Sequence, residues 1–182
     1  MGHSSRGVFL MKHSTNLMDG KTYGKEDIKK ELAAVAAHNK KQEFLVEEFL
    51  RSAGGEYKIP DDYKFYMFNG EVATIQVINR LSPTKGYTRC YNENWQVMPN
   101  INTYYPKGHY QPPPKSFAEM VQKAKELSRA YEMFVMVDFY DTDKGAVFGE
   151  FTPTSFGGLY YTRKGDRFLA AYWDRFYKGK AF

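Results

Sequence analysis

The sequence predicts an α+β fold in which the strands pair mainly in antiparallel fashion. Residues 63–80 and residues 134–152 each contain two largely apolar runs joined by a short polar turn, which is the pattern of a β-hairpin. Residues 25–39 and residues 116–128 carry apolar side chains at helical spacing, which predicts two main helices. Strands that mix with helices in this way are typical of the α+β class.

Length and composition limit the possible classes of protein. The chain has 182 residues and a mass of 21.1 kDa, which suits one domain or two small lobes that share a cleft. Apolar residues make up 42% and charged residues 26%, so an intrinsically disordered tail is excluded. No apolar run approaches the ~20 residues of a membrane-spanning helix. The N-terminus lacks the long apolar segment of a signal peptide.

Cysteine content and charge indicate the compartment and the kind of partner. The single cysteine, Cys90, excludes a disulfide framework and a zinc site of four cysteines, and it favours a reducing, cytoplasmic compartment. The net charge is +5, from 26 basic and 21 acidic residues. This charge fits an anionic partner such as a nucleotide, a phosphate or a nucleic acid. A basic surface kept for solubility explains it equally well.

The first 50 residues predict a loop, a strand, a helix and a second strand. Val8 to Met11 form a short apolar run, typical of a buried strand, and residues 13–24 have the composition of a loop. The helix over residues 25–39 follows, and a strand is expected over Phe44–Val46. One face of the helix carries four apolar side chains, which are Ile28, Leu32, Val35 and Ala36.

Local signals mark the first hairpin and the second helix. Tyr63–Phe68 and Glu71–Arg80 flank Asn69-Gly70, the strongest two-residue signal for a tight primed turn. Ser116, with Glu119 three residues later, predicts a capping box at the start of a helix. The buried face of that helix is expected to carry Phe117, Met120, Val121, Ala124 and Leu127. The chain from residue 162 onward is expected to end in a helix.

The second hairpin brings two carboxylates toward each other. Asp138 alternates with apolar neighbours and therefore points away from the core. If Tyr140 pairs with Ala146, then Glu150 and Thr152 lie on the same face as Asp138. Oxygen ligands at this spacing suit Mg²⁺, which normally arrives with nucleotide phosphates. Alternatively both acids are solvated strand residues, and a register shifted by one residue would separate them.

Two further features suggest phosphate binding. The N-terminal segment contains Gly2, Ser4, Ser5 and Gly7, small residues whose backbone N–H groups can approach phosphate oxygens. A frayed terminus is the alternative. Lys64 and Arg80 occupy the two arms of the first hairpin and would clamp a phosphate, or they are edge charges that discourage aggregation.

An aromatic and basic segment spans residues 87–110. Its side chains would stack on nucleobases or sugars, or they would pack over a small sheet. The residues concerned are Tyr87, Arg89, Tyr91, Trp95, Tyr104, Tyr105, Lys107 and Tyr110.

Six segments occur in an order that is characteristic of one family. Pro114–Ser128 is followed by Phe134–Tyr140 and Phe148–Thr152, and the hairpin segment 62–70 precedes them. Residues 45–50 and residues 2–8 come earlier in the chain. In this order the segments resemble the ATP-grasp superfamily, in particular its TupA-like branch, which is linked to teichuronopeptide and cell-surface polysaccharide synthesis. The similarity covers most of residues 2–160.

The resemblance implies an ATP-grasp-like fold with a nucleotide cleft between two lobes, and a role for each candidate residue. Asp138 and Glu150 would bind Mg²⁺, with Thr152 in the place of the third ligand, an Asn in many relatives. Lys64 and Arg80 would contact phosphate or an acyl-phosphate intermediate and so serve catalysis. The hinge would receive ATP through Glu47, Glu48 and Phe49, and the loop over the phosphates would contain Gly2, Ser4, Ser5 and Gly7.

The family reaction activates a carboxylate with ATP, and an amine then attacks to give an amide. We expect residues 1–50 to form a partial small lobe and residues 51–182 the larger lobe with the metal site. Met136 stands where the branch usually has Arg. The chain begins inside the family pattern, so we expect it to lack the N-terminal lobe and to have little ligase activity alone. A non-catalytic module that binds nucleic acid or glycan through residues 87–110 is the alternative function, although a nucleic-acid partner is the less expected one.

Overall fold

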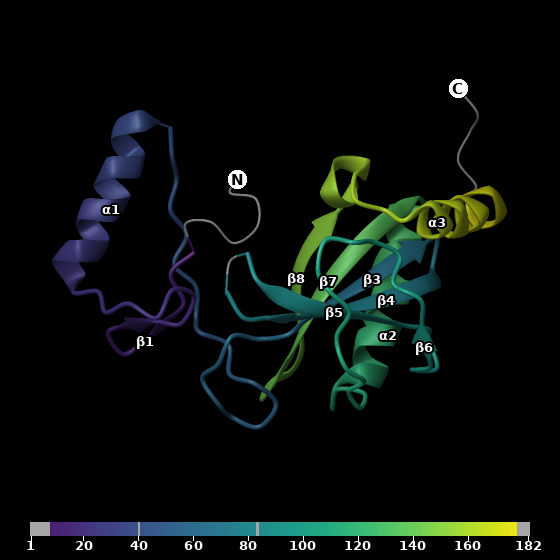
Figure 1. The fold of residues 1–182 in the computed structure, drawn as a ribbon, viewed down its shortest axis with the longest axis horizontal. Coiled ribbons are helices and arrows are strands. Elements are labelled where there is room, and N and C mark those ends of the chain that lie inside the picture. The colour runs from purple at the N-terminus through teal and green to yellow at the C-terminus, as the bar shows by residue number, and fades with distance from the viewer. Residues whose placement is uncertain (1–7, 40, 83, 178–182) are drawn as a thin grey trace.

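The computed structural model describes residues 8–39, 41–82 and 84–177 and contains a six-stranded sheet flanked by helices (Figure 1). Its spatial strand order is β6-β5-β4-β3-β7-β8, and all neighbouring strands pair antiparallel. In chain order these strands are β3 (Asp62–Phe68), β4 (Glu71–Arg80), β5 (Gly86–Tyr91), β6 (Val97–Met98), β7 (Phe134–Thr142) and β8 (Gly145–Thr152). The other elements are β1 (Met11–Lys12), β2 (Thr15–Asn16), α1 (Lys25–His38), α2 (Phe117–Tyr131), the 3₁₀ turn η1 (Ser155–Gly158) and α3 (Arg163–Phe176). The predicted α+β class is confirmed.

Alternation along β3 divides the protein into two cores. Phe65 and Met67 face α2, where they meet Met120 and Ala124 in a fully buried cluster. The even-numbered residues of β3 point to the opposite face, where Phe68 belongs to a second cluster that includes Leu169 of α3. Side chains of a strand alternate between faces, so α2 and α3 cover opposite sides of the sheet, as Figure 1 shows.

The Asn69-Gly70 turn joins β3 to β4, as predicted. Asn69 has φ 48° and Gly70 has φ 88°, the left-handed backbone that a two-residue primed turn needs at both positions. The Gly70 N–H donates to the Ser128 hydroxyl at 3.0 Å, which ties the turn to the end of α2. The register shifts between Tyr66 and Met67, so β4 contains one extra residue there.

The register of the β7–β8 hairpin differs from the predicted one. Tyr140 pairs with Val147, one residue away from the expected Ala146. A bulge between Val137 and Phe139 then shifts the pairing by one residue, so that Met136 pairs with Thr152. The pairing predicted at the turn is therefore wrong, but the bulge returns Thr152 to the face that carries Met136 and Asp138.

Three other local predictions are corrected. Val8–Met11 is not a continuous strand, because β1 begins only at Met11. Phe44–Val46 forms no strand and has no strand partner among the described residues; Leu45 and Val46 are 81% and 94% exposed. The capping box at Ser116 is absent, since the Ser116 hydroxyl donates to Asp141 Oδ1 at 2.6 Å and Glu119 accepts from the Ala146 N–H. Both side chains therefore form hydrogen bonds with the β7–β8 hairpin and not with the backbone at the start of α2.

The N-terminal elements lie to one side of the sheet (Figure 1). α1 forms close to the predicted bounds but contains no buried residue, so its apolar face is not part of either core. The segment that follows it approaches the β7–β8 turn, where Arg51 pairs with Asp143 at 2.5 Å and Lys144 pairs with Glu48 at 2.6 Å. Within the described part of the chain, no helix is both long and apolar enough to cross a membrane.

The start of α3 sits directly on the backbone of residue 101. The predicted C-terminal helix is thus confirmed, and its position depends on Gly165, which is buried. A Cβ atom on Gly165 would lie 2.2 Å from the carbonyl oxygen of Ile101. The same stretch is held by a backbone hydrogen bond of 2.9 Å from Thr162 N–H to Ile101 O. No side chain at position 165 fits between α3 and the backbone of Ile101.

Replacing Gly165 by Ala should destabilise the protein by about 1–3 kcal/mol, because α3 must move away from Ile101. The higher helix propensity of Ala, up to ~1 kcal/mol, offsets only part of this cost. Urea denaturation measures the change. Gly54→Ala is the matched control, since a Cβ there meets only the Ser52 hydroxyl at an ordinary 3.7 Å. Equal stability of the two variants would contradict the close approach.

Candidate functional site

A row of buried polar side chains crosses the sheet on the face opposite α2. Lys64 of β3 lies directly opposite Asp138 of β7 and directly opposite Gln76 of β4. All three are at least nine-tenths buried. Directly paired residues share a face, so the alternation that sends the odd-numbered residues into the α2 core brings these three together on the other side.

Lys64 and Asp138 form a buried ion pair. The Lys64 ammonium group donates to Asp138 Oδ2, and the two residues are 9% and 3% exposed. The other carboxylate oxygen, Asp138 Oδ1, is buried and has no hydrogen-bond partner among the described residues. Buried charges are normally paired or bound to a metal, so Asp138 has one oxygen satisfied by Lys64 and one available to a further cation or donor.

Burial and nearby charge act in opposite directions on the pKa values of this pair. Burial raises the pKa of Asp138 to about 6, although Lys64 lowers it, and the carboxylates of Asp62 and Glu150 contribute to the increase. For Lys64, burial lowers the pKa, but attraction to Asp138 and Asp62 outweighs burial and holds the pKa above its ordinary value. Lys64 therefore remains charged at neutral pH, and Asp138 titrates close to the physiological range.

A second ion pair lies beside the first. Arg80 Nη2 donates to Asp62 Oδ2 at 2.5 Å, and Arg80 Nη1 donates to the Tyr105 hydroxyl at 3.2 Å. Asp62 comes two residues before Lys64 on β3 and so shares its face. Burial lowers the pKa of Arg80, but the Asp62 carboxylate more than compensates and raises it. Sequence analysis missed Asp62, although its two-residue spacing from Lys64 was a usable signal.

Glu150 and Thr152 lie on the side of Asp138. Thr152 pairs directly with Met136, and Glu150 is two residues from Thr152 on the same strand. The Glu150 carboxylate acts on the pKa values of both Asp138 and Lys64, and Glu150 is exposed. A Cβ on Gly149 would lie 3.5 Å from Asp138 Cβ, so two consecutive residues of β8 oppose Asp138 at the bulge.

This set of oxygen atoms fits a magnesium ion that also binds phosphate. The orphaned Asp138 Oδ1 and the exposed Glu150 carboxylate supply hard ligands. Among the described residues, however, no group of three or more His, Cys, Asp or Glu side chains is placed to hold a metal. Mg²⁺ usually uses only one or two carboxylates, with waters and substrate phosphates completing its shell. The site therefore fits a metal that arrives with a nucleotide, not a metal held by protein alone.

A buried hydrogen-bond network continues the polar row beyond Lys64. The Tyr66 hydroxyl donates to Gln76 Oε1 at 3.0 Å, and Gln76 Nε2 donates to Thr88 Oγ1 at 3.0 Å and to Asn102 Oδ1 at 3.2 Å. These bonds hold the side chain of Gln76, which faces Lys64 across the strand pair. The network thereby gives the floor of the site a fixed arrangement.

The other predicted site residues lie elsewhere. Gly2, Ser4, Ser5 and Gly7 are outside the described residues. Glu47, Glu48 and Phe49 belong to an extended segment without strand pairing. The Glu48–Lys144 ion pair places this segment at the turn of the hairpin that carries Asp138 and Glu150. The Phe49 ring packs edge-on against Tyr57, with ring centroids 5.1 Å apart.

The aromatic segment 87–110 serves mainly in packing. Tyr91, Trp95 and Tyr105 are buried, and the rings of Tyr91 and Trp95 stack with centroids 4.3 Å apart. Tyr87 and Tyr110 are 46% and 61% exposed. A surface that stacks on bases or sugars needs several exposed rings in a row, so this arrangement gives no support to the alternative function.

Lowering the pH from about 7 to about 4 should stabilise the wild-type protein relative to Asp138→Asn. The pKa of Asp138 is about 6 in the folded protein and about 4 in an unfolded chain, so the folded state binds the proton more tightly. This contribution is complete below about pH 4 and is lost as the pH rises through about 6. Urea denaturation of both proteins across this range measures the difference; a constant difference, or one that grows with pH, would contradict the raised pKa.

Comparison with known proteins identifies the family. The family model described as TupA-like ATP-grasp matches residues 1–174. A search of curated proteins and a search of solved structures gave no match. The match extends over β3, β4, β7 and β8, the strands that carry both ion pairs and Glu150, and it agrees with the antiparallel α+β architecture. The chain belongs to the TupA-like ATP-grasp family.

Proposed function

We propose that this chain binds ATP together with Mg²⁺ on the polar face of its six-stranded sheet. The observation that carries the proposal is the juxtaposition of Lys64 and Asp138, with one buried carboxylate oxygen left over. Structural ion pairs are normally satisfied on both sides. An oxygen without a partner, beside an exposed second carboxylate, is suited to a cation that enters from solvent.

In this proposal Asp138 and Glu150 hold the metal, and Thr152 occupies the adjacent ligand position. A bound Mg²⁺ would neutralise charge on the transferring phosphates. Lys64 places one positive charge at the same carboxylate before any ligand enters. Arg80, fixed by Asp62 and Tyr105, adds a second cation on the same face. Fixed cations of this kind stabilise the negative charge of phosphoryl transfer without reorganisation.

The remaining parts of the nucleotide would extend toward the N-terminal segment. We assign adenine to the backbone of Glu47 to Phe49, which contacts the β7–β8 turn through Glu48 and Lys144. The phosphates would be covered by the loop that contains Gly2, Ser4, Ser5 and Gly7. This assignment divides the chain into a small lobe, residues 1–50, and a larger lobe with the metal site, residues 51–182.

The reaction we propose is that of an ATP-dependent ligase. A carboxylate is activated as an acyl phosphate, and an amine then attacks to give an amide. The family to which the chain belongs supports a role in cell-surface polysaccharide or teichuronopeptide synthesis. Because this reaction consumes ATP, and because the single cysteine is a buried free thiol, we place it in the cytoplasm.

Asp138→Asn and Glu150→Gln should each weaken magnesium-dependent ATP binding at least about tenfold, the cost of ~1.4 kcal/mol of metal–ligand energy. Glu150→Gln should change ATP binding without Mg²⁺ only slightly. The Glu150 carboxylate is exposed, and removing an exposed charge changes the free energy of the protein little. Titration calorimetry with and without Mg²⁺ measures both. Glu71→Gln, an exposed acid at the start of β4, is the matched control. Wild-type affinity in either site variant would refute the metal assignment.

Lys64→Met should also lower the affinity for ATP, by about tenfold or more, since hydrogen bonds to charged groups contribute roughly 1.5–3 kcal/mol. Met preserves much of the side-chain volume, so the core on the other face should remain packed. Lys123→Met on the exposed side of α2 is the control for loss of one positive charge. Circular dichroism confirms folding, and calorimetry with Mg²⁺ gives the affinities. Equal affinities for the two variants would remove Lys64 from the phosphate site.

A further inference from the structure

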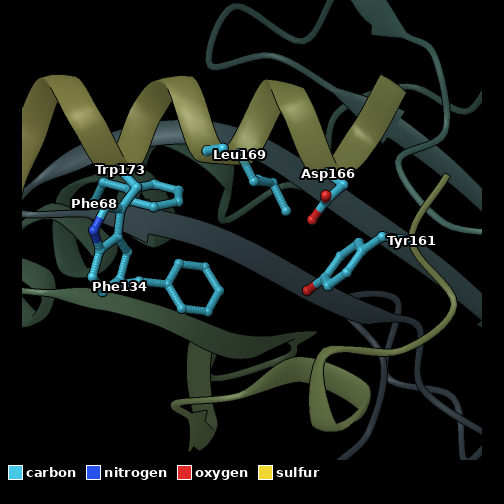
Figure 2. A pocket seen from close by; sticks show the side chains of 7 residues that line it. Phe68, Phe134, Tyr161, Asp166, Leu169 and Trp173 are labelled. Atoms are coloured by element: carbon cyan, nitrogen blue, oxygen red, sulfur yellow. The ribbon is translucent and has the colours of Figure 1, made fainter. Parts of the chain in front are cut away.

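The face of the sheet opposite α2 has an apolar end and a polar end. At the apolar end an open groove lies beside α3, and Figure 2 shows Phe68, Phe134 and Trp173 at one end of it. No Lys or Arg is among the described residues that line this groove. Lys64 and Arg80 lie at the polar end of the same face, so an anionic ligand is attracted to that end and not to the groove.

One aromatic side chain, that of Tyr140, belongs to the polar end. Tyr140 follows Asp138 by two residues on β7 and therefore lies on the same face of the sheet. The register between β3 and β7 pairs Tyr63 with Phe139, and the same register continued by one residue places Tyr140 opposite Asp62. Tyr140 thus has one acid of each ion pair as a neighbour.

The bulge in β8 gives the Tyr140 ring its position. Tyr140 pairs with Val147, and its ring leans over Gly149, where a Cβ atom would lie only 3.1 Å from Tyr140 Cε2. Cε2 is bonded to the carbon that carries the hydroxyl, so this contact fixes the hydroxyl-bearing end of the ring. Glu150 follows Gly149 directly in the strand. The ring therefore reaches the part of β8 that carries the second proposed metal ligand.

The Tyr140 hydroxyl has no hydrogen-bond partner among the described residues. It is also absent from the buried side-chain atoms that lack a partner, so the hydroxyl is open to solvent while the side chain as a whole is half-buried. A phenylalanine ring would pack on Gly149 equally well, because the contact uses a ring carbon alone. Packing therefore accounts for the ring but not for the hydroxyl.

The charges of the site surround this hydroxyl. Burial raises the pKa of Tyr140, the carboxylates of Asp62, Asp138 and Glu150 raise it further, and Arg80 lowers it. The hydroxyl therefore keeps its proton at neutral pH. The three carboxylates outnumber the two cations of this face, and Mg²⁺ would reverse that balance. A neutral O–H group then adds a hydrogen bond to a bound anion without placing another charge on the sheet.

We propose that the Tyr140 hydroxyl donates a hydrogen bond to an oxygen of the phosphates that Mg²⁺ holds. This inference rests on the proposed function, because the metal and the phosphates arrive together as the nucleotide. Lys64 and Arg80 are already paired with carboxylates, whereas the Tyr140 hydroxyl has no bond to another described residue that must break. Hydroxyl groups form short, strong hydrogen bonds with charged oxygens.

Tyr140→Phe removes the hydroxyl and keeps the ring on Gly149. The variant should bind ATP with Mg²⁺ about tenfold more weakly than wild type, the lower end of the effect of a hydrogen bond to a charged group. AMP lacks the β- and γ-phosphates, so its affinity should not differ between the two proteins. The midpoint of urea denaturation should also stay unchanged, because no described residue loses a partner. Titration calorimetry gives the affinities. Tyr87→Phe is the matched control, since Tyr87 is exposed and lies on the face toward α2.

The results distinguish this inference from the proposed function. If the wild-type protein does not bind ATP with Mg²⁺, the proposed function fails, and the role of Tyr140 fails with it. If wild type binds and Tyr140→Phe binds equally well, only the role of Tyr140 is refuted. An equal loss of affinity for ATP and AMP would place the effect away from the metal-bound phosphates. A lower urea midpoint in Tyr140→Phe would show that the hydroxyl has a structural partner, and either result contradicts the inference.

Discussion

A buried ion pair between two neighbouring strands constrains the rest of the structure. Lys64 and Asp138 are both nearly inaccessible to water, and removing such charges from water costs roughly several kcal/mol per ion, which only good pairing offsets. A slip of one residue between β3 and β7 would turn one of the two charges into the apolar core beneath α2, away from its partner, and would expose the apolar residues of that strand. The ion pair and the apolar alternation therefore specify the same register.

That register decides what each face of the sheet can do. The face under α2 is apolar from Tyr63 to Met67 on β3 and from Val135 to Phe139 on β7, with Phe65, Val135 and Val137 fully buried. The other face is divided along its length: Phe68 and Phe134 pack under α3, and Lys64 and Asp138 lie toward the opposite end. One helix per face thus stabilises the sheet while leaving part of one face polar. The polar part is rigid because both its strands are internal to the sheet.

Sequence reasoning succeeded where local chemistry decides the structure. The turn at Asn69-Gly70 needs left-handed backbone at both residues. Asn followed by Gly is the residue pair that adopts this backbone most readily, so these two residues alone predict the turn. The separation of Asp138 from its odd-numbered neighbours follows from alternation alone. Sequence-based prediction failed where pairing between distant segments determines the structure. Phe44–Val46 has the composition of a strand, yet it has no partner among the described residues, and no local pattern reports the absence of a partner.

The pairing of Asp62 with Arg80 was missed for a related reason. Arg80 was a candidate for phosphate binding, but its contact with Asp62 joins the start of one strand to the end of the next across 18 positions. Only the register of β3 on β4 brings them together. Once that register is known, Asp62, Lys64 and Arg80 are seen to lie on one face, and a solvated edge would not keep Asp62 and Lys64 buried. The burial of Asp62 and Lys64 argues against charges that serve solubility alone.

The bulge in β8 shows how a short motif encodes the geometry of the site. Phe148 and Phe151 both belong on the α2 side, where Phe148 packs against Phe139 and Phe151 against Tyr131. Residues three apart cannot share a face of a regular strand, because side chains alternate with a period of two. The strand must contain one extra residue between them, and the extra residue falls opposite Asp138.

A glycine occupies the position next to Asp138 in this bulge. Gly149 has no Cβ, and a Cβ there would come within 3.1 Å of the Tyr140 ring. Glu150 then lies on the face of Asp138 as a consequence of aromatic packing on the other side of the sheet, so the spacing of two partly exposed phenylalanines sets the position of a carboxylate in the candidate site.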